Sequence, residues 1–334
     1  MTEADLAALG VHRIAVPVPF PQAGGPVNAY LVEEEGGGLL MFDAGLGSPE
    51  GLAALEQGFA RLRRSFDEVR RIVLSHGHVD HYGAARTLME RAGRTVPVFA
   101  HPADLPKVSE AGPRWKDLLP FYAAYLGKLG VPPDTLAAIA SEVGGGFTLA
   151  RRILDVRPLE PGEVLHARYL ALEVMHMPGH TPGLCCLYDR KQRLFLSGDH
   201  LLEKVSPNPI IDLGPKGEEG SFRPLVAYLE SIRRVHALEV ELVLPGHGPP
   251  FAEHRRVIER LLQFYEKRQA KIRDALARCP LTGYELTQAL FPWARPGDLF
   301  LVVSETVANV EVLEARGEVS RSLDGGVYRF GLAA

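Results

Sequence analysis

Three histidines and one aspartate fall within six residues of this chain, in the run His76-Gly77-His78-Val79-Asp80-His81. Imidazole nitrogens and carboxylate oxygens are the protein ligands that suit zinc, iron and manganese. A predicted strand over residues 69–75 leads directly into the run, so that neighbouring side chains at the turn can face different metal ions. An isolated histidine is usually a surface or core residue, whereas this density of ligand types predicts a metal site.

Three further candidate ligands stand beside glycines where predicted strands end. His180 lies in Pro178-Gly179-His180-Thr181, Asp199 in Ser197-Gly198-Asp199, and His247 in Pro245-Gly246-His247-Gly248. Glycine permits the tight turns and the close backbone approach that a compact site needs. Each short motif is weak evidence alone, but their order along the chain after residues 76–81 strengthens the prediction.

Alternating strands and helices must position these residues. Strands are expected over 12–20, 27–35, 39–43, 69–75 and 96–100, with helices over 50–64 and 81–93. This alternation predicts an α/β fold. Between about 102 and 160 two predicted helices interrupt the pattern and indicate a helical insertion. Strands return over 163–198, and a helix over 222–236 precedes the strand that leads to His247.

The chain changes character after His247. A long helix rich in arginine and lysine is expected over 252–278, followed by helices over 281–291 and 304–317. Asp324-Gly325-Gly326 then predicts a hairpin turn. This order is typical of a winged helix. We therefore expect a catalytic domain over 1–250, with the insertion at about 102–160, and a linker helix plus winged-helix-like domain over 251–334.

Taken in this order, the motifs resemble those of the metallo-β-lactamase-fold hydrolase superfamily over residues 12–250. The resemblance implies an αββα sandwich with two metal ions in the cleft between its sheets. It implies that Asp199 bridges the ions and that Asp43, at a strand end, orients a ligand. The expected ligands are His76, His78 and His180 for the first ion, and Asp80, His81 and His247 for the second.

The same resemblance implies the chemistry. We expect two divalent metal ions, zinc in the first place, with iron or manganese as alternatives. Two ions about 3.5–4 Å apart can share a hydroxide as nucleophile and can stabilise the reacting oxygen and the leaving group. Asp80 is either a proton shuttle or purely a ligand. The expected activity is hydrolysis of a small acyl substrate, an ester or thioester, by glyoxalase II-like chemistry.

A second activity is suggested by the layout, which resembles the β-lactamase-like 2 branch with its winged-helix-like appendage. Animal members of that branch are endoribonucleases, so single-stranded RNA is the alternative substrate and partner. Residues 255–278 carry eight basic and three acidic residues, which form either an RNA path or an ordinary solvated face. The helix over 304–317 has a net charge of −2, which disfavours DNA reading and thus a ligand-gated regulator.

Four other side chains are candidates for substrate contact. His200 follows Asp199 and either contacts substrate or forms a hydrogen bond with the backbone. The insertion carries Phe121, Tyr122 and Tyr125. These aromatic rings can stack on bases, enclose an acyl chain, or pack the insertion onto the core.

Composition narrows the remaining possibilities. The 334 residues carry a formal charge of −4, which disfavours a DNA-packaging protein. Three cysteines, two of them adjacent, cannot form a disulfide framework. The N-terminal sequence is not of the signal-peptide type, and no apolar run approaches the roughly 18 residues of a membrane span. We expect a cytoplasmic protein without membrane contact, with a homodimer as a further expectation.

Overall fold

The structure, a computed structural model, describes residues 1–19, 21–146, 151–214 and 216–333. Its first sheet has six strands in the spatial order β1 (Val11–Val16), β2 (Val27–Glu33), β3 (Leu39–Phe42), β4 (Val69–Val73), β5 (Val98–Ala100) and β6 (Val156–Pro158). The first three strands pair antiparallel, and β3 to β6 pair parallel.

A second sheet of five strands lies against the first. Its spatial order is β11 (Leu242–Pro245), β10 (Leu194–Gly198), β9 (Cys185–Asp189), β8 (Ala171–His176) and β7 (Val164–His166). Strands β10 and β11 are parallel, and the other pairs are antiparallel. Candidate ligands follow β4 in the first sheet and β10 and β11 in the second, so both sheets contribute to the candidate site.

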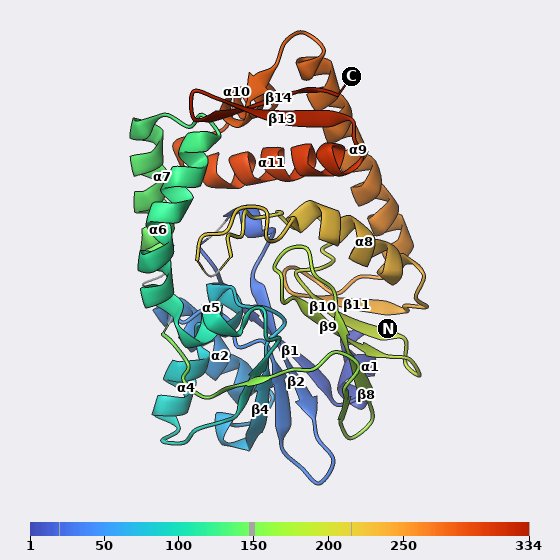
Figure 1. Ribbon diagram of the computed structural model, residues 1–334. Helices are drawn as coiled ribbons and strands as arrows, with labels where there is room; N and C mark the ends of the chain where they lie inside the picture. Colours follow the sequence, from blue (N-terminus) through green and yellow to red (C-terminus); the bar gives the residue numbers. More distant parts are fainter. Residues whose placement is uncertain (20, 147–150, 215, 334) are drawn as a thin grey trace.

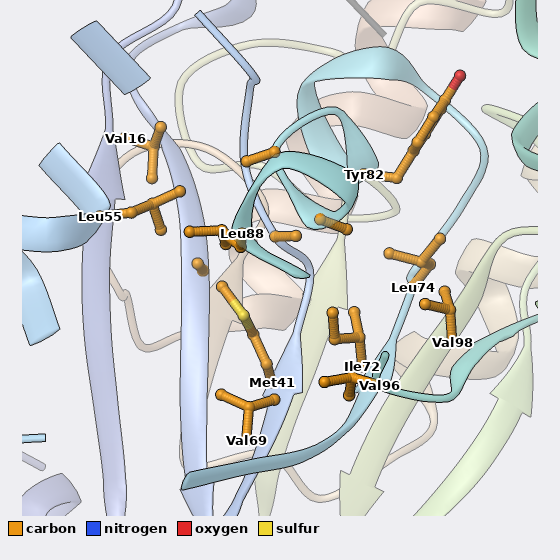
Figure 2. Packing of buried hydrophobic residues seen from close by; sticks show 14 of the residues in the cluster. Val16, Met41, Leu55, Val69, Ile72, Leu74, Tyr82, Leu88, Val96 and Val98 are labelled. Carbon is orange, nitrogen blue, oxygen red and sulfur yellow. The ribbon is translucent and has the colours of Figure 1, made fainter. Parts of the chain in front are cut away.

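Alternating side chains of the buried strands separate the layers. In β3, Leu39 and Met41 belong to a cluster with the helices outside the first sheet, whereas Leu40 and Phe42 belong to the cluster between the sheets. Figure 2 shows the outer cluster, in which Met41 packs near Val69 and Ile72. This period of two is what a strand buried on both faces requires. The helices covering this face are α2 (Pro49–Arg61) and α4 (Ala85–Arg91).

The second sheet is covered on its outer face by α8 (Pro224–His236) and α9 (His254–Leu276). Phe195 of β10 and Val243 of β11 pack there with Ile232 and Ile258 from these helices. Helix, sheet, sheet and helix thus form four layers, which confirms the predicted αββα sandwich. Shorter elements are α1 (Glu3–Ala8), α3 (Val79–Tyr82) and the 3-10 turns Pro21–Ala23, Phe66–Glu68 and Pro296–Asp298.

The interrupting segment is helical, as predicted. It contains α5 (Leu105–Ser109), α6 (Ala111–Lys128) and α7 (Pro133–Gly146), and Figure 1 shows α6 and α7 side by side, running from the sheets towards α11. The boundary at about 160 was wrong, because β6 at residues 156–158 completes the first sheet beside β5. This strand has three residues, two of them exposed, so it shows no apolar alternation that a sequence pattern could reveal.

The C-terminal elements follow the predicted order of helices and hairpin. After α9 come β12 (Leu281–Thr282), α10 (Gly283–Leu290), α11 (Leu299–Ala315), β13 (Val319–Asp324) and β14 (Val327–Leu332). The hairpin closes through Gly325 and Gly326, whose φ angles of 56° and 84° suit a two-residue turn. The short strand β12, missed in the sequence, pairs with β14.

Helix α11 is buried along most of its length. Residues 302–304 and 306–313 are all buried, and the helix packs against α8, α9 and α10. Its carboxylate Glu305 pairs with Arg268 of α9 at 3.0 Å. A helix enclosed in this way does not present a face to a DNA groove. None of the helices in the described residues combines the length and apolar character that crossing a membrane requires.

Candidate metal centre

The seven predicted ligands meet at one edge of the two sheets. The turn after β4 carries His76 and His78, and the one-turn helix α3 carries Asp80 and His81. The remaining three follow strands of the second sheet: His180 after β8, Asp199 directly after β10, and His247 two residues after the end of β11. Since β10 and β11 are parallel, their carboxyl ends necessarily open at the same edge.

Three groups of side chains have ligand atoms close enough to share an ion. Within each group these atoms lie within 4.8 Å of one another, and the groups are His76, His78 and His180; His76, His81 and Asp199; and Asp80, His81 and His247. The first and third correspond to the two predicted ligand sets. The structure thus brings together every residue predicted to hold a metal.

Asp199 lies between the two predicted sets. Its Oδ2 is 3.6 Å from Nε2 of His180 and 3.5 Å from Nε2 of His247, and its Oδ1 is 3.4 Å from Nε2 of His81. His180 belongs to one set, whereas His81 and His247 belong to the other. One carboxylate therefore reaches both sets, as a bridging ligand must.

Asp43 holds histidines of both sets through two hydrogen bonds. Its Oδ2 accepts from Nδ1 of His81 at 2.8 Å and from Oγ of Ser75 at 2.7 Å. Because the hydroxyl donates to Asp43, it can accept from Nδ1 of His76, 2.9 Å away. Each histidine then directs Nε2 towards the centre. Sequence analysis identified Asp43 but missed Ser75, whose position beside His76 was the available signal.

The turn that carries His247 is held by the first sheet. The fully buried amide of Asn28 in β2 donates to the carbonyl oxygens of Pro245 and Gly248, at 2.9 and 2.7 Å. His247 Nδ1 donates to the Gly25 carbonyl oxygen at 3.1 Å. Gly246 is required here because a Cβ at this position would overlap Oδ1 of Asp199. These contacts place a second-sheet ligand against residues of the first sheet.

A second buried carboxylate, Asp104, joins two of the ligand-bearing turns. It accepts from the backbone of Gly77 at 2.9 Å, from Oγ1 of Thr181 at 2.5 Å and from the backbone of Gly183 at 3.2 Å. It also pairs with Lys107 at 3.0 Å. Asp104 and Lys107 were missed in the sequence, because no local motif marks this pair and the other partners of their side chains lie 27 or more residues away.

The electrostatics of the first set favour neutral imidazoles. Burial, and next the charge of His81, lower the pKa of His76 well below its usual value. Burial and the neighbouring His180 lower the pKa of His78 to about 3. The pKa of His180 is also lowered, mainly by burial, although Asp199 opposes the shift. Neutral imidazole is the form that binds a metal ion.

The second set contains charged groups that offset one another. Burial alone would raise the pKa of Asp80, but His81 and His247 bring it down to about 2. Burial also disfavours charge on His81, yet Asp199 and Asp43 raise its pKa above the usual value. The pKa of His247 is raised in the same way, because Asp199 and Asp80 together outweigh the effect of burial. The carboxylates are therefore ionised, as metal ligands are.

Unpartnered polar atoms show that this donor set fits metal ions. Nε2 of His76, Nε2 of His81 and Oδ1 of Asp199 are buried and form no hydrogen bond with any described residue. A buried polar atom without a partner is costly in a folded protein. All three atoms belong to the group that could share an ion, so nitrogen and oxygen ligation would satisfy them together.

His200 does not occupy the position expected of a substrate contact. Its side chain is fully buried, and neither ring nitrogen has a hydrogen-bond partner among the described residues. The backbone N–H of His200, by contrast, donates to the Ser197 carbonyl oxygen at 3.0 Å. The centroid of the His200 ring instead lies 5.3 Å from that of Tyr228, a residue of helix α8, which covers the outer face of the second sheet.

Two of the three insertion aromatics pack inside the protein. Tyr122 and Tyr125 are buried in the cluster that joins α6 to α11, so they pack the insertion against the C-terminal helices, where the expectation had placed that packing on the core. The Tyr122 hydroxyl donates to the Ile211 carbonyl oxygen at 3.2 Å. Phe121 is 45% exposed and lies against Gly217, so of the three it alone offers an accessible ring.

A pair of stacked histidines lies outside the metal centre. The rings of His101, after β5, and His176, at the end of β8, are 4.0 Å apart and inclined by 10°. Nδ1 of His101 accepts from the backbone of Ala103 at 3.2 Å. Burial, and next the charge of His176, lower the pKa of His101 to about 4. The stack joins the two sheets in the neutral state.

We expect this stack to lose stability in mild acid. Unfolded, His101 takes up a proton near pH 6.5, whereas folding holds its pKa at about 4. The free energy of unfolding therefore falls between these values as pH falls, by up to about 1.4 kcal/mol per pH unit from this residue. The free energy of unfolding would be measured by urea denaturation at several pH values. His101→Asn, which retains an acceptor for Ala103, should show a weaker dependence of this free energy on pH than the wild type. Equal slopes for both proteins would contradict the prediction.

Known proteins are similar to this chain in sequence and in fold. Residues 23–247 match the family described as the metallo-beta-lactamase superfamily. The chain is 32% identical over 324 residues to the probable metallo-hydrolase YqjP of Bacillus subtilis, covering 95% of this chain and 97% of that protein. The matched range of the family model includes all the residues gathered at the candidate metal centre.

Two further similarities bear on architecture and activity. The metallo-beta-lactamase family protein TTHA1429 from Thermus thermophilus superposes with a TM-score of 0.79 at 30% identity, covering 97% of this chain and 98% of that one. The acyl-coenzyme A thioesterase MBLAC2 of Gallus gallus is 36% identical over 107 residues, 30% of this chain and 35% of that protein. The first similarity extends through the C-terminal elements, and the second is confined to a part of the chain.

Proposed function

The chain belongs to the metallo-β-lactamase superfamily of metal-dependent hydrolases, and on that premise we propose that it is a dinuclear hydrolase of small acyl thioesters. The observation that carries the proposal is the position of Asp199 between two sets of histidine and carboxylate donors. His76, His78 and His180 would hold one ion, and Asp80, His81 and His247 the other. Zinc suits these ligands, and iron or manganese are the alternatives.

Bound ions would polarise the thioester carbonyl and lower the pKa of water to near neutrality. The chain's own residues orient the donors: Asp43 and Ser75 fix two histidines, and Asn28 fixes the His247 turn. Asp80 is the candidate for moving a proton. Its Oδ2 lies 3.2 Å from His247 Nε2 and its side chain is 13% exposed, so an attacking water could reach it.

The leaving group favours a thioester over other small esters. A thiol has a pKa of about 8.5, so a thiolate departs from the acyl carbon without a protonated partner. The likeness to the thioesterase MBLAC2 supports the same substrate class.

Charge pairing on α9 reduces the support for RNA as a substrate. Five of its seven arginines and lysines are engaged by other groups: Arg255 with Glu239, Arg256 with Glu253, Arg260 with the Glu203 carbonyl, Arg268 with Glu305, and Arg273 with Glu266 and Glu318. Paired guanidinium groups release fewer counterions on binding phosphates. The endoribonuclease alternative therefore becomes an outcome of the test.

The test uses the metal-loaded protein and Asp80→Ala side by side. Thiol release from coenzyme A thioesters of short, medium and long acyl chains should be catalysed by the wild type and strongly reduced in the variant. Labelled single-stranded RNA, incubated in parallel, should remain intact. Cleavage of RNA by the wild type alone, without thiol release from any thioester, would replace the proposal with the endoribonuclease alternative.

A further inference from the structure

An irregular segment, residues 207–213 and here called the strap, lies between the candidate metal centre and the C-terminal helices. It is the yellow loop beneath α11 in Figure 1. Nδ1 of His180 donates to the carbonyl oxygen of Asn208 in the strap at 2.9 Å. This bond commits Nδ1 as the donor and leaves Nε2 for the centre. The strap therefore sets the tautomer and the ring orientation of a candidate ligand.

The insertion holds the strap at its far end. Lys107 pairs with Asp212 at 2.5 Å as well as with Asp104. The Tyr122 hydroxyl donates to the Ile211 carbonyl and accepts from the backbone of Leu213 at 3.3 Å. The strap belongs to no helix or strand, so these contacts fix its conformation in place of regular secondary-structure hydrogen bonds.

The C-terminal helices hold the near end, beside Asn208 itself. The Tyr265 hydroxyl of α9, almost fully buried, donates to the Pro207 carbonyl oxygen at 3.1 Å. Nδ2 of Asn208 donates to the Leu301 carbonyl oxygen in the first turn of α11 at 3.3 Å. Further along, Ile211 and Leu213 pack in one apolar cluster with residues of α11.

From these contacts we infer that α9 and α11 position His180 through the strap. The C-terminal part would then serve the hydrolase by completing its metal centre rather than by reading nucleic acid. An irregular segment fixed from outside has fewer accessible conformations, so less entropy is lost when His180 binds an ion. The inference rests on the ligand set of the proposed function.

The experiment removes the C-terminal contacts without touching a ligand. Tyr265→Phe deletes one buried hydroxyl, and Asn208→Ala deletes the link to Leu301 but keeps the backbone carbonyl that His180 needs. Zinc and cobalt(II) would be titrated into the full chain. Each variant should bind the ions several-fold more weakly and the double variant about tenfold, the range seen when groups supporting a ligand are changed. The absorption spectrum of bound cobalt(II) should shift in both single variants.

Tyr188→Phe provides the matched control. It also loses a hydroxyl that donates to a backbone carbonyl, that of Glu239 at 2.6 Å, but away from the strap. It should lose comparable thermal stability and keep the wild-type metal affinity and cobalt spectrum. Strap variants that behave like this control would overturn the inference. A wild type that binds neither zinc nor cobalt would instead refute the ligand set, before any variant is compared.

Linkage supplies a second, independent measurement. If α11 positions His180, then metal binding must in turn stabilise the contact between the strap and α11. Amide hydrogen exchange in the strap and in the first turn of α11, from Leu299, should slow when zinc is added to the wild type. This protection should weaken in Tyr265→Phe. Zinc protection confined to the ligand turns would overturn the inference.

Discussion

Replacing Asp199 by asparagine should reduce thioester hydrolysis by about 10³-fold or more, since bridging charge stabilisation contributes several kcal/mol to the transition state. Both carboxylate oxygens face histidine nitrogens, at 3.4–3.6 Å. In Asp199→Asn one oxygen becomes an NH2 group, which cannot ligate an ion. Elemental analysis should find fewer than two ions per chain, and thiol release should fall in proportion to the lost dinuclear centre.

Asp189→Asn is the control for this change. Asp189 is an equally buried carboxylate at the end of β9 that lies away from the candidate metal centre. It accepts hydrogen bonds from the backbone of Ala171 and of Gln192. Its replacement should lower stability and leave metal content unaltered. If Asp199→Asn keeps two ions and hydrolyses thioesters within tenfold of the wild type, Asp199 is not a bridging ligand.

Asp104→Asn is expected to have the largest effect on stability, about 3–5 kcal/mol in the free energy of unfolding. Asp104 accepts from two ligand-bearing turns and also pairs with Lys107, and it is fully buried. An asparagine at this position has only one acceptor oxygen, and its NH2 group would face the groups that donate to Asp104. The loss of a buried ion-pair partner falls in this range.

Urea denaturation of the metal-free proteins would measure the effect of Asp104→Asn. Asp189→Asn again serves as the control, because it loses hydrogen bonds but no ion pair and should cost about 1–3 kcal/mol. Thr181→Val, which removes only the 2.5 Å contact with Asp104, should lie between the wild type and Asp104→Asn. Equal losses for Asp104→Asn and Asp189→Asn would show that the pair with Lys107 contributes nothing beyond ordinary hydrogen bonds.

The fold was largely predictable because apolar patterning marks elements that are long or fully buried. Helix α2 has its apolar residues on one face, and β3 is an uninterrupted apolar run. Among the missed strands, β6 and β12 have three and two residues. Such short pairings are decided by the neighbouring strand rather than by their own sequence.

In the candidate site, too, residues that stand in local sequence motifs could be predicted, and residues that depend on distant partners could not. The histidines and aspartates of the proposed ligand set could be identified because they stand in short motifs at strand ends. Ser75 and Asp104 support that set, yet their partners are backbone groups and side chains brought near by folding. Tyr265 reaches the strap from a helix 58 residues further along the chain. No local pattern encodes such a contact.

Helices α9 and α11 also determine how far this protein is modular. Val257 and Ile258 of α9 pack against the second sheet, whereas Ile272 and Leu276 of the same helix pack in the C-terminal cluster. Removal of the C-terminal part would therefore strip apolar cover from the catalytic body itself. In this chain the two parts share one continuous apolar packing, and the similarity to YqjP spans both.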